Sequence, residues 1–353
     1  MSTGSLPVIR VEGTAYEMGY QHGKQSPELI QYMAREALLK EVRRYSKKAD
    51  LSWMAELAKE YEPFIREYAP HLLEEIRGIG DGAGITYQEA LMLQCRSELA
   101  YKVKAEAECT SFGLERERSA TGEVIVGQNL DLGAAMEDGA VILFLYPAKG
   151  PAILTWTLAG TVGQFGLNSA GLGRCGNVLI SSGWRVGLPT TILFRRILEQ
   201  SSVKEAEAFM AGAYRAKSNN FMLGDETGCV ANLETTVTDF RVLQPKDGIV
   251  THTNHYLHPD LIPGEMFYDV NDSAVRLRRL NELLAGSPRK IAPERLKAFL
   301  ADHANAPHTI CKHVEKDSPR AKTVASGILY PESRTMEVCP GNPCTSQFTT
   351  YRL

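Results

Sequence analysis

The sequence predicts an α+β fold, with helices concentrated in the first part of the chain and strands in the rest. Before about residue 108 the apolar residues recur with helical spacing. After Cys109 the sequence predicts short extended segments separated by turns that contain glycine. The later helices and strands mix without the regular alternation of a doubly wound parallel sheet. We therefore expect a layered α+β domain.

The N-terminal part predicts a short strand at residues 8–13 and then helices. Thr14 is expected to cap the first helix, and Glu17, three residues later, completes the pattern of a capping box. Longer helices are expected at 27–47, 52–76 and 87–99, and the second of these carries an aromatic stripe that we assign to the core. Closely spaced glycines are expected to end that second helix: Gly78, Gly80, Gly82 and Gly84.

The part of the chain after Cys109 is expected to contain most of the strands. Residues 110–116 and 123–131 are expected to form a hairpin around Ser119–Gly122, which has the composition of a turn. Further strands are expected at 140–146, 152–158, 163–167, 220–224, 229–235, 238–243, 325–330 and 335–338, and helices at 188–200, 203–213, 274–284 and 293–302.

The expected hairpin brings an acidic residue close to the thiol. A turn centred on Ser119–Gly122 places Cys109 opposite position 132, within one residue of Asp131. Residues that lie directly opposite in a hairpin have Cβ atoms about 4.5–5.5 Å apart. A slip of one residue would change the face, so this argument predicts proximity and not orientation.

Composition and charge argue against several classes of partner. The net charge of −3 and the pI near 6.3 predict no basic face, so we expect no nucleic-acid partner. No basic segment followed by an apolar run marks a signal peptide, and no apolar stretch approaches the roughly 18 residues of a membrane helix. We expect a cytoplasmic protein with no membrane partner.

The cysteines and histidines predict neither disulfides nor a metal site. Seven scattered cysteines favour a reducing compartment, and no Cys-x-x-Cys pair indicates a zinc ribbon. Two histidine sets have spacings that resemble those of metal ligands, but the second is spaced five apart and cannot share one helical face. With no acidic cluster nearby, we expect no metal and no resident cofactor. The two sets are His252, His255 and His258, and His303, His308 and His313.

Cys109 lies where the character of the chain changes, and Thr110 and Ser111 follow it. A nucleophilic residue with small hydroxyl neighbours at such a boundary indicates a chain that is cut there. Cleavage would give Cys109 both a thiol and a free α-amine, whose unperturbed pKa of about 7.7–8.0 suits a base near neutral pH. We expect residues 1–108 and 109–353 to be two segments of one domain.

Three ordered motifs resemble the isopenicillin N acyltransferase family of autoproteolytic N-terminal-nucleophile hydrolases. They are Cys109–Gly113 (CTSFG), Gly127–Asp131 (GQNLD) and Thr253–His255 (TNH), and the segments 16–23 and 340–343 also resemble that family. The likeness covers nearly the whole chain. It implies a four-layer αββα fold, a precursor cut just before the nucleophile, and two fragments that remain together.

The resemblance also implies a role for individual residues. Cys109 matches the nucleophile, Asp131 a buried acid that organises the site, and Asn254 an amide that helps to bind the oxyanion. The family's arginine near the C-terminal strands has no clean match; Arg320 is nearest and Lys322 competes with it.

The residue before the expected cut departs from the family pattern. Glu108 stands where the penicillin-pathway enzyme has glycine. A carboxylate at that position is expected to slow the cut or to alter its pH dependence.

The expected activity is acyl transfer through a cysteine acyl-enzyme. Cys109 would take the acyl group of a small amide or acyl thioester and pass it to water or an amine, with acyl-CoA as a conceivable substrate rather than a cofactor. The expected partners are this small molecule and the chain's own N-terminal fragment, and a homo-oligomer is left open. Two alternatives remain: an uncleaved hydrolase using Cys109, a histidine such as His255 and an acid, and a binding protein without catalysis.

Overall fold

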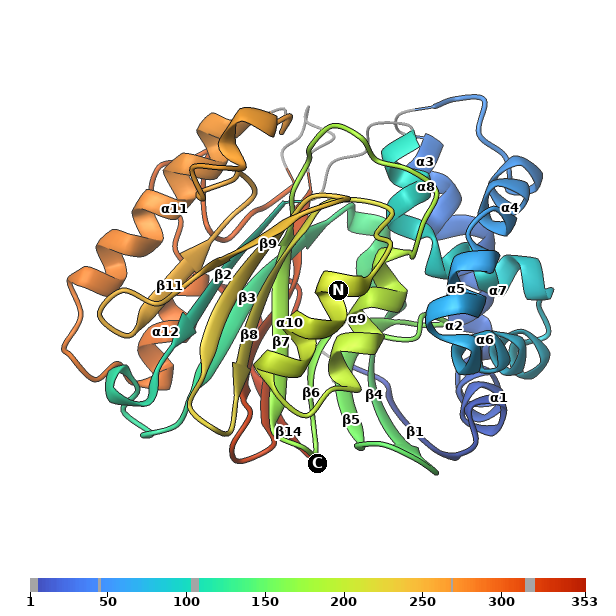
Figure 1. The fold of residues 1–353 in the computed structure, drawn as a ribbon, viewed down its shortest axis with the longest axis horizontal. Helices are drawn as coiled ribbons and strands as arrows, with labels where there is room; N and C mark the ends of the chain where they lie inside the picture. The colour runs from blue at the N-terminus through green and yellow to red at the C-terminus, as the bar shows by residue number, and fades with distance from the viewer. Residues whose placement is uncertain (1–5, 44–45, 103–107, 268, 315–320) are drawn as a thin grey trace.

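Two β-sheets pack face to face, and helices lie outside them on both sides, giving four layers (Figure 1). The computed structural model describes residues 6–43, 46–102, 108–267, 269–314 and 321–353. One sheet has the order β1 (Val8–Gly13), β4 (Ala140–Pro147), β5 (Ile153–Leu158), β6 (Phe165–Asn168), β7 (Leu172–Val178), β8 (Asn219–Asp225), β9 (Val230–Thr235) and β10 (Phe240–Leu243). The other has the order β11 (Ile249–His252), β2 (Glu108–Leu114), β3 (Ile125–Leu132), β12 (Lys322–Tyr330), β13 (Thr335–Pro340) and β14 (Thr349–Arg352). The α+β class predicted from the sequence is confirmed.

The helices form separate groups around the two sheets (Figure 1). Helices α11 (Val270–Ala285) and α12 (Pro293–Leu300) cover the outer face of the β2–β3–β11 sheet, where Leu280, Leu284 and Leu296 pack against Phe112 and Ile328. Helices α9 (Thr190–Leu198) and α10 (Val203–Gly212) cover the other sheet. The N-terminal helices lie beside β1 and β4: α1 (Ala15–Gln25), α2 (Pro27–Tyr32), a π-helical turn (Met33–Ala37), α3 (Leu38–Arg43), α4 (Leu51–Lys59), α5 (Glu62–Tyr68), α6 (Pro70–Ala83), α7 (Tyr87–Gln94) and α8 (Arg96–Lys102).

The helix expected at 52–76 is in fact three helices. Pro63 stands at the start of α5 and Pro70 at the start of α6. Proline is favoured in the first turn of a helix, where its missing N–H is not needed, and it interrupts a helix elsewhere. The capping box of Thr14 and Glu17 at the start of α1 is confirmed.

Three of the four glycines expected to end the second helix lie inside α6, and two of them pack against α1. A Cβ at Gly78 would lie 2.2 Å from the carbonyl oxygen of Tyr16, and one at Gly82 would lie 2.3 Å from that of Tyr20. Only Gly84, with a φ of +68°, terminates the helix in the left-handed conformation. The expectation was therefore wrong for Gly78, Gly80 and Gly82, and two of these, Gly78 and Gly82, let the two helix backbones approach closely.

The β2–β3 hairpin pairs with a register two residues away from the expected one. Glu108 lies opposite Asp131, and Cys109 lies opposite Leu130 rather than residue 132. A 3₁₀ turn at Arg116–Arg118 lengthens the connection, so the hairpin does not centre on Ser119–Gly122. Because side chains alternate with a period of two, a shift of two residues keeps each side chain on its expected face.

Three strands were not expected from the sequence: β7, β11 and β14. Strand β7 contains two glycines and Arg174, which is unusual for a buried strand. The arginine is nevertheless buried, with its guanidinium 3.5 Å from the ring centre of Phe194. Strand β7 packs against β2 and β3 and therefore forms part of the wall next to Cys109.

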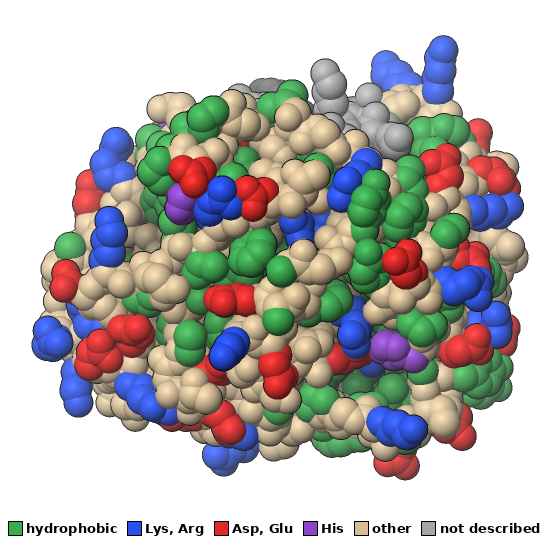
Figure 2. Space-filling view, in the orientation of Figure 1, with side chains coloured by type: hydrophobic (Ala, Val, Ile, Leu, Met, Phe, Trp, Pro, Cys, Tyr) green, Lys and Arg blue, Asp and Glu red, His purple; other side chains and the backbone are tan. Residues whose placement is uncertain are grey.

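Within the described ranges, no helix is long and apolar enough to cross a membrane. On the face shown in Figure 2, basic and acidic side chains are interspersed. That face therefore presents no continuous basic surface of the kind that follows a nucleic-acid backbone.

Candidate active site

The backbone of Cys109, near the start of β2, is held on both sides by side chains from other elements. Its N–H donates a hydrogen bond to Oδ1 of Asn254, at 2.9 Å. Its carbonyl oxygen accepts one from Nη1 of Arg276, at 2.7 Å. Asn254 in turn donates from Nδ2 to the carbonyl oxygen of Val178 on β7, at 3.0 Å. Residue 109 is thus fixed between the end of β7 and helix α11.

Arg276 connects most of the groups around this backbone. Nη1 also donates to Oγ1 of Thr110 (3.0 Å), and Nη2 donates to Oδ1 of Asn254 (2.9 Å). Nε donates to Oδ2 of Asp272, one turn earlier on α11, at 2.8 Å. Burial lowers the pKa of Arg276, but the charges of Asp272, Glu108 and Asp131 outweigh it, so the pKa is raised. The guanidinium is therefore a permanent buried cation.

Lys312 supplies a second buried cation beside the same bond. Its Nζ forms an ion pair with Glu108 and a hydrogen bond of 2.9 Å with Oδ1 of Asp272. Burial raises the pKa of Asp272, but Arg276 and Lys312 outweigh it and hold that pKa well below its usual range. Glu108, Asp272 and Lys312 therefore form a buried charged group directly before Cys109.

Asp131 lies opposite Glu108 and is completely buried. Its Oδ1 accepts a hydrogen bond of 2.7 Å from Oγ1 of Thr323, and its Oδ2 has no hydrogen-bond partner among the described residues. Burial raises the pKa of Asp131 to about 7, although Arg276 and Lys312 act against it. Near neutral pH both protonation states of this carboxyl are therefore populated.

The charges around the bond balance when Asp131 is protonated. The buried carboxyls are those of Glu108, Asp131 and Asp272, and the buried cations are Arg276 and Lys312. With Asp131 neutral, two negative charges face two positive charges. A third carboxylate would have no cation of its own, which agrees in direction with the raised pKa of Asp131.

The thiol of Cys109 is protonated at neutral pH in the uncut chain. Burial, together with the charge of Asp131, raises its pKa to about 12, against partial stabilisation by backbone hydrogen bonds from Asp131 and Val178. The thiolate is the nucleophilic form, so a base must remove this proton.

A cavity of about 40 Å³ adjoins the thiol and is lined by Gln128, Arg174, Asn177 and Phe194, among others. It can hold a few water molecules. Ligand pockets commonly have volumes of about 300–1,000 Å³. The uncut chain therefore has room beside the thiol for water but not for an acyl substrate.

The structure brings together three of the site residues predicted from the sequence: Cys109, Asp131 and Asn254. Arg320 lies outside the described residues. Its competitor Lys322 forms an ion pair with Glu137, and the cation that contacts the Cys109 backbone is Arg276.

The cations at the site, Arg276 and Lys312, were missed by the sequence reasoning. One signal was present for Arg276. Buried residues of α11 recur every four positions, and the apolar pair Leu280 and Leu284 continues backwards to Arg276 and Asp272. Charged residues on the buried face of an amphipathic helix indicate a site rather than a surface ion pair.

The histidines near the site have other partners. His252 is buried and contacts Oε1 of Glu234 at 2.8 Å, and His255 contacts Oγ of Ser273 at 2.7 Å. Burial, with His252 and Arg276 nearby, lowers the pKa of His255 to about 4. Among the residues the structure describes, no histidine is hydrogen-bonded to Cys109, so the geometry does not favour a Cys109–His255 pair.

The fold and the family together define the class of protein, an α+β member of an acyl-transferase family. The model of the family described as "Acyl-coenzyme A:6-aminopenicillanic acid acyl-transferase" matches residues 118–345. This is well over half of the chain, and the chain belongs to that family. The match begins after Cys109 and so does not bear on the thiol itself.

Individual relatives agree with this membership. The chain is 28% identical over 339 residues to the acyl-coenzyme A:6-aminopenicillanic-acid-acyltransferase 40 kDa form of Emericella nidulans, covering 95% of this chain and 92% of the relative. It is 24% identical to an uncharacterised protein of Archaeoglobus fulgidus, covering 85% of this chain and 58% of that protein.

Solved structures with partial similarity include a conjugated bile acid hydrolase and a penicillin V acylase. A variant of conjugated bile acid hydrolase from Clostridium perfringens has a TM-score of 0.48 and 14% identity, covering 69% of this chain and 97% of its own. Penicillin V acylase from Agrobacterium tumefaciens has a TM-score of 0.48 and 13% identity, covering 69% of this chain and 86% of its own. These TM-scores are too low to bear on the function.

Proposed function

We propose that this chain is a self-processing cysteine acyl-transfer enzyme. Cys109 cuts the Glu108–Cys109 bond and then serves as the N-terminal nucleophile. The processed enzyme takes the acyl group of a small amide or acyl thioester and passes it to water or an amine. The observation that carries the proposal is the clamp on residue 109, in which Asn254 holds its N–H and Arg276 holds its carbonyl oxygen.

We assign Asp131 as the base of the uncut chain on its charge and its pKa; its side chain lies on the other face of the sheet from the thiol, so the proton would pass between them through an intervening group. A pKa of about 7 allows Asp131 to be ionised near neutral pH, and its charge acts on the Cys109 thiol. A base that titrates near the working pH is the most effective proton acceptor. Asp131 thus serves in the first reaction, before an α-amine exists.

The self-cleavage step balances as an N-to-S acyl shift. The thiolate of Cys109 attacks the carbonyl carbon of Glu108, and the C–N bond breaks. The nitrogen of Cys109 takes up the proton and becomes a free amine, while Glu108 is held as a thioester. Water then hydrolyses the thioester, giving the carboxylate of residue 108 and the free thiol of residue 109.

After the cut, Asn254 and Arg276 would act on the new N-terminus. Oδ1 of Asn254 already accepts the N–H of residue 109 and would hold the amine near the thiol as the base. The role expected from the sequence for this amide, binding the oxyanion, falls to its Nδ2 group, which donates one N–H to Val178. One such donor is worth roughly 2.7–4 kcal/mol in the transition state.

The class of substrate follows from family membership and from the thiol. The relative in Emericella nidulans is named for acyl-coenzyme A and 6-aminopenicillanic acid. A shared fold does not fix the substrate. For this chain we therefore propose only the shared chemistry, a carbonyl attached to nitrogen or sulfur, with acyl-CoA as one candidate donor.

Intact mass spectrometry of the purified protein tests the proposal. Wild-type protein should give two species, residues 1–108 and 109–353, and Cys109→Ala should give one of full length. Cys229→Ala, which changes an exposed cysteine, is the matched control and should be cut as the wild type is. A wild-type protein that stays in one piece and still hydrolyses amides would overturn the proposal. A protein that is neither cut nor active would instead be a binding protein on this fold.

A further inference from the structure

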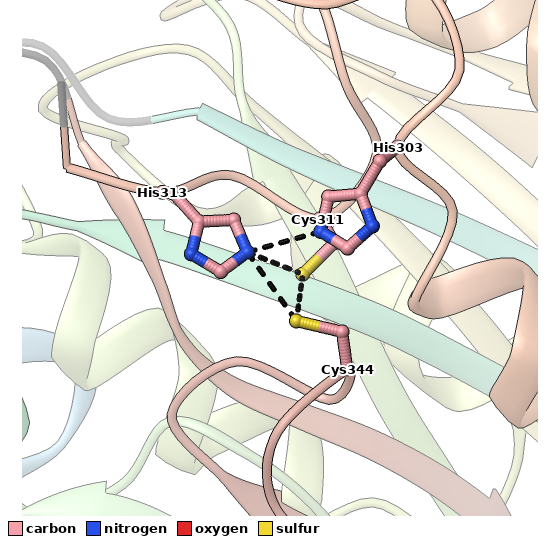
Figure 3. A group of neighbouring side chains, drawn as sticks. All are labelled: His303, Cys311, His313 and Cys344. Atoms are coloured by element: carbon pink, nitrogen blue, oxygen red, sulfur yellow. Dashed lines mark hydrogen bonds between the residues drawn. The ribbon is translucent and has the colours of Figure 1, made fainter.

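Four potential metal ligands meet at a place that the proposed reaction does not use. His303, Cys311 and His313 come from the connection between α12 and β12, and Cys344 comes from the segment between β13 and β14 (Figure 3). Their ligand atoms all lie within 4.8 Å of one another. We propose that these four side chains bind one Zn²⁺ ion.

The distances between the ligand atoms fit a tetrahedral site. Zinc binds thiolate sulfur at about 2.3 Å and imidazole nitrogen at about 2.0–2.1 Å, so tetrahedral ligand atoms lie about 3.8 Å apart for two sulfurs and about 3.3 Å for two nitrogens. The two sulfurs of Cys311 and Cys344 are 3.7 Å apart. The Nε2 atoms of His303 and His313 are 3.0 Å apart.

The mixed pairs complete the same geometry. Sulfur and nitrogen ligands of one zinc ion lie about 3.6 Å apart. Nε2 of His313 is 3.7 Å from Sγ of Cys311 and 3.3 Å from Sγ of Cys344. The two remaining pairs, from His303 to each sulfur, lie within 4.8 Å, so shifts of about 1 Å separate this arrangement from a tetrahedral one.

The chemistry of the ligand set selects zinc. Two sulfurs and two imidazole nitrogens in a tetrahedral arrangement are typical of zinc, whereas oxygen ligands suit magnesium or calcium. Two thiolates neutralise the charge of Zn²⁺. Nδ2 of Asn342 lies 3.4 Å from Sγ of Cys311 and donates to it, which is the kind of supporting contact that orients a metal ligand.

The sequence reasoning against a metal site considered Cys-x-x-Cys pairs and histidines spaced closely along the chain. Here the ligands lie on loops, and Cys344 is far from the other three in the sequence. The histidine predicted to group with His303 and His313 was His308, but its Nδ1 contacts Asp272 at 3.0 Å. A cysteine pair and two histidines therefore replace the histidine triplet suggested by spacing.

The proposed ion would hold Lys312 in place, because Lys312 lies between two of the ligands. Its side chain reaches Glu108 and Asp272, and its backbone N–H donates to Oγ1 of Thr323 at 2.9 Å. Thr323 is the residue that donates to Asp131. A zinc ion bound here would thus fix the segment 311–313, whose Lys312 neutralises Glu108. This consequence for processing rests on the proposed function, whereas the metal site does not.

Metal analysis of the full chain tests the site directly. The purified protein, loaded with ZnCl₂ and dialysed, should contain one zinc per chain by inductively coupled plasma mass spectrometry. Cobalt in place of zinc should give the visible and thiolate charge-transfer bands of tetrahedral Co²⁺. Cys344→Ser and His303→Ala should lose at least tenfold in zinc affinity, whereas Cys229→Ser should bind zinc as the wild type does.

Three results would overturn the inference. They are a wild-type protein that retains no zinc after loading, a Cys344→Ser variant with unchanged zinc affinity, and a disulfide between Cys311 and Cys344 in protein purified under reducing conditions. If Cys344→Ser fails to fold, the cobalt spectrum of the wild type decides, since thiolate bands require cysteine ligands. A chain that is cut but binds no zinc overturns this inference alone, and one that binds zinc but is not cut overturns the proposed function alone.

Discussion

Lys312 forms a buried ion pair with Glu108, the residue immediately before the proposed nucleophile. Glu108 was the residue that fitted the proposed cut least well, because the family pattern has glycine at this position. The structure gives the carboxylate a partner that is 5% exposed and is shared with Asp272. A charged residue at this position is therefore compatible with a folded precursor.

Replacing Lys312 should strongly destabilise the uncut chain. Lys312→Met leaves Glu108 and Asp272 buried without this cation, and removal of one partner from a buried pair costs about 3–5 kcal/mol. We expect that loss in the free energy of unfolding, measured by urea titration in the Cys109→Ala background, where the chain stays intact. Adding Glu108→Gln should restore part of it.

The control for this loss is an exposed ion pair. Lys59 pairs with Glu56 on the surface of α4, with side chains 45% and 66% exposed, so Lys59→Met should change stability by less than about 1 kcal/mol. Equal losses for Lys312→Met and Lys59→Met would contradict the role given to Lys312.

Asp131 should make the uncut chain less stable as the pH rises. The pKa of Asp131 in the folded chain is about 7, above the ordinary 3.8. Its contribution to the free energy of unfolding is therefore complete below about pH 4 and is lost as the pH rises to 7. In that window the unfolded chain ionises first, and stability falls by up to about 1.4 kcal/mol per pH unit.

Unfolding of the Cys109→Ala protein at pH 5 and pH 7, with and without Asp131→Asn, measures this effect. The free energy of unfolding should depend less on pH in the protein that carries Asp131→Asn. Its stability relative to the protein with Asp131 should increase from pH 5 to pH 7. Parallel pH profiles would show that Asp131 does not titrate in this range.

Arg276→Lys should keep the charge but lose the clamp on residue 109. A lysine cannot donate in the fork that reaches Cys109, Asn254 and Asp272 together. We expect self-processing to slow by at least tenfold, followed as fragment formation after refolding from urea. Arg279→Lys is the control, since Arg279 lies three residues later on the same helix and pairs with Asp302. This variant should cut itself at the wild-type rate. A wild-type rate for Arg276→Lys would remove the clamp from the mechanism.

The crossing of α1 and α6 should not tolerate a methyl group. Gly82→Ala places a Cβ 2.3 Å from the carbonyl oxygen of Tyr20, so one helix must move, at a cost of about 1–3 kcal/mol or more. Gly212→Ala, at the end of α10 with nothing within 4 Å, should instead stabilise by about 0.5–1 kcal/mol. Thermal unfolding of both variants in the Cys109→Ala background measures the difference, and the same sign for both would contradict the close approach.

The sequence predicted those parts of the structure that depend on local patterns. The capping box at Thr14, the proximity of Asp131 to Cys109 and most strands after Cys109 follow from spacing and turn composition. The exact register did not follow, because a 3₁₀ turn at Arg116–Arg118 adds residues that look like part of a strand.

The parts that the sequence did not predict depend on contacts between distant segments. Gly78 and Gly82 resemble helix breakers until α1 is seen against them. The apolar face of α11 indicates that Arg276 is buried, but its contact with the Cys109 carbonyl becomes evident only when β2 is seen beside α11. Lys312 has no local signal at all, since its role comes from Glu108, which is far away in the sequence.

The parallel pairing of β1 with β4 sets the order of events during biosynthesis. Val8 to Gly13 of β1 pair with Ile142 to Pro147 of β4, so the first strand has no partner until residues well beyond the proposed cut have been made. The proposed site also needs Arg276 and Lys312, which are made later than both strands, so cleavage would follow the synthesis of β1 and β4. The N-terminal fragment then already contributes β1 to a sheet shared with the rest of the chain. Breaking the Glu108–Cys109 bond would leave the fragment attached by the backbone hydrogen bonds between β1 and β4.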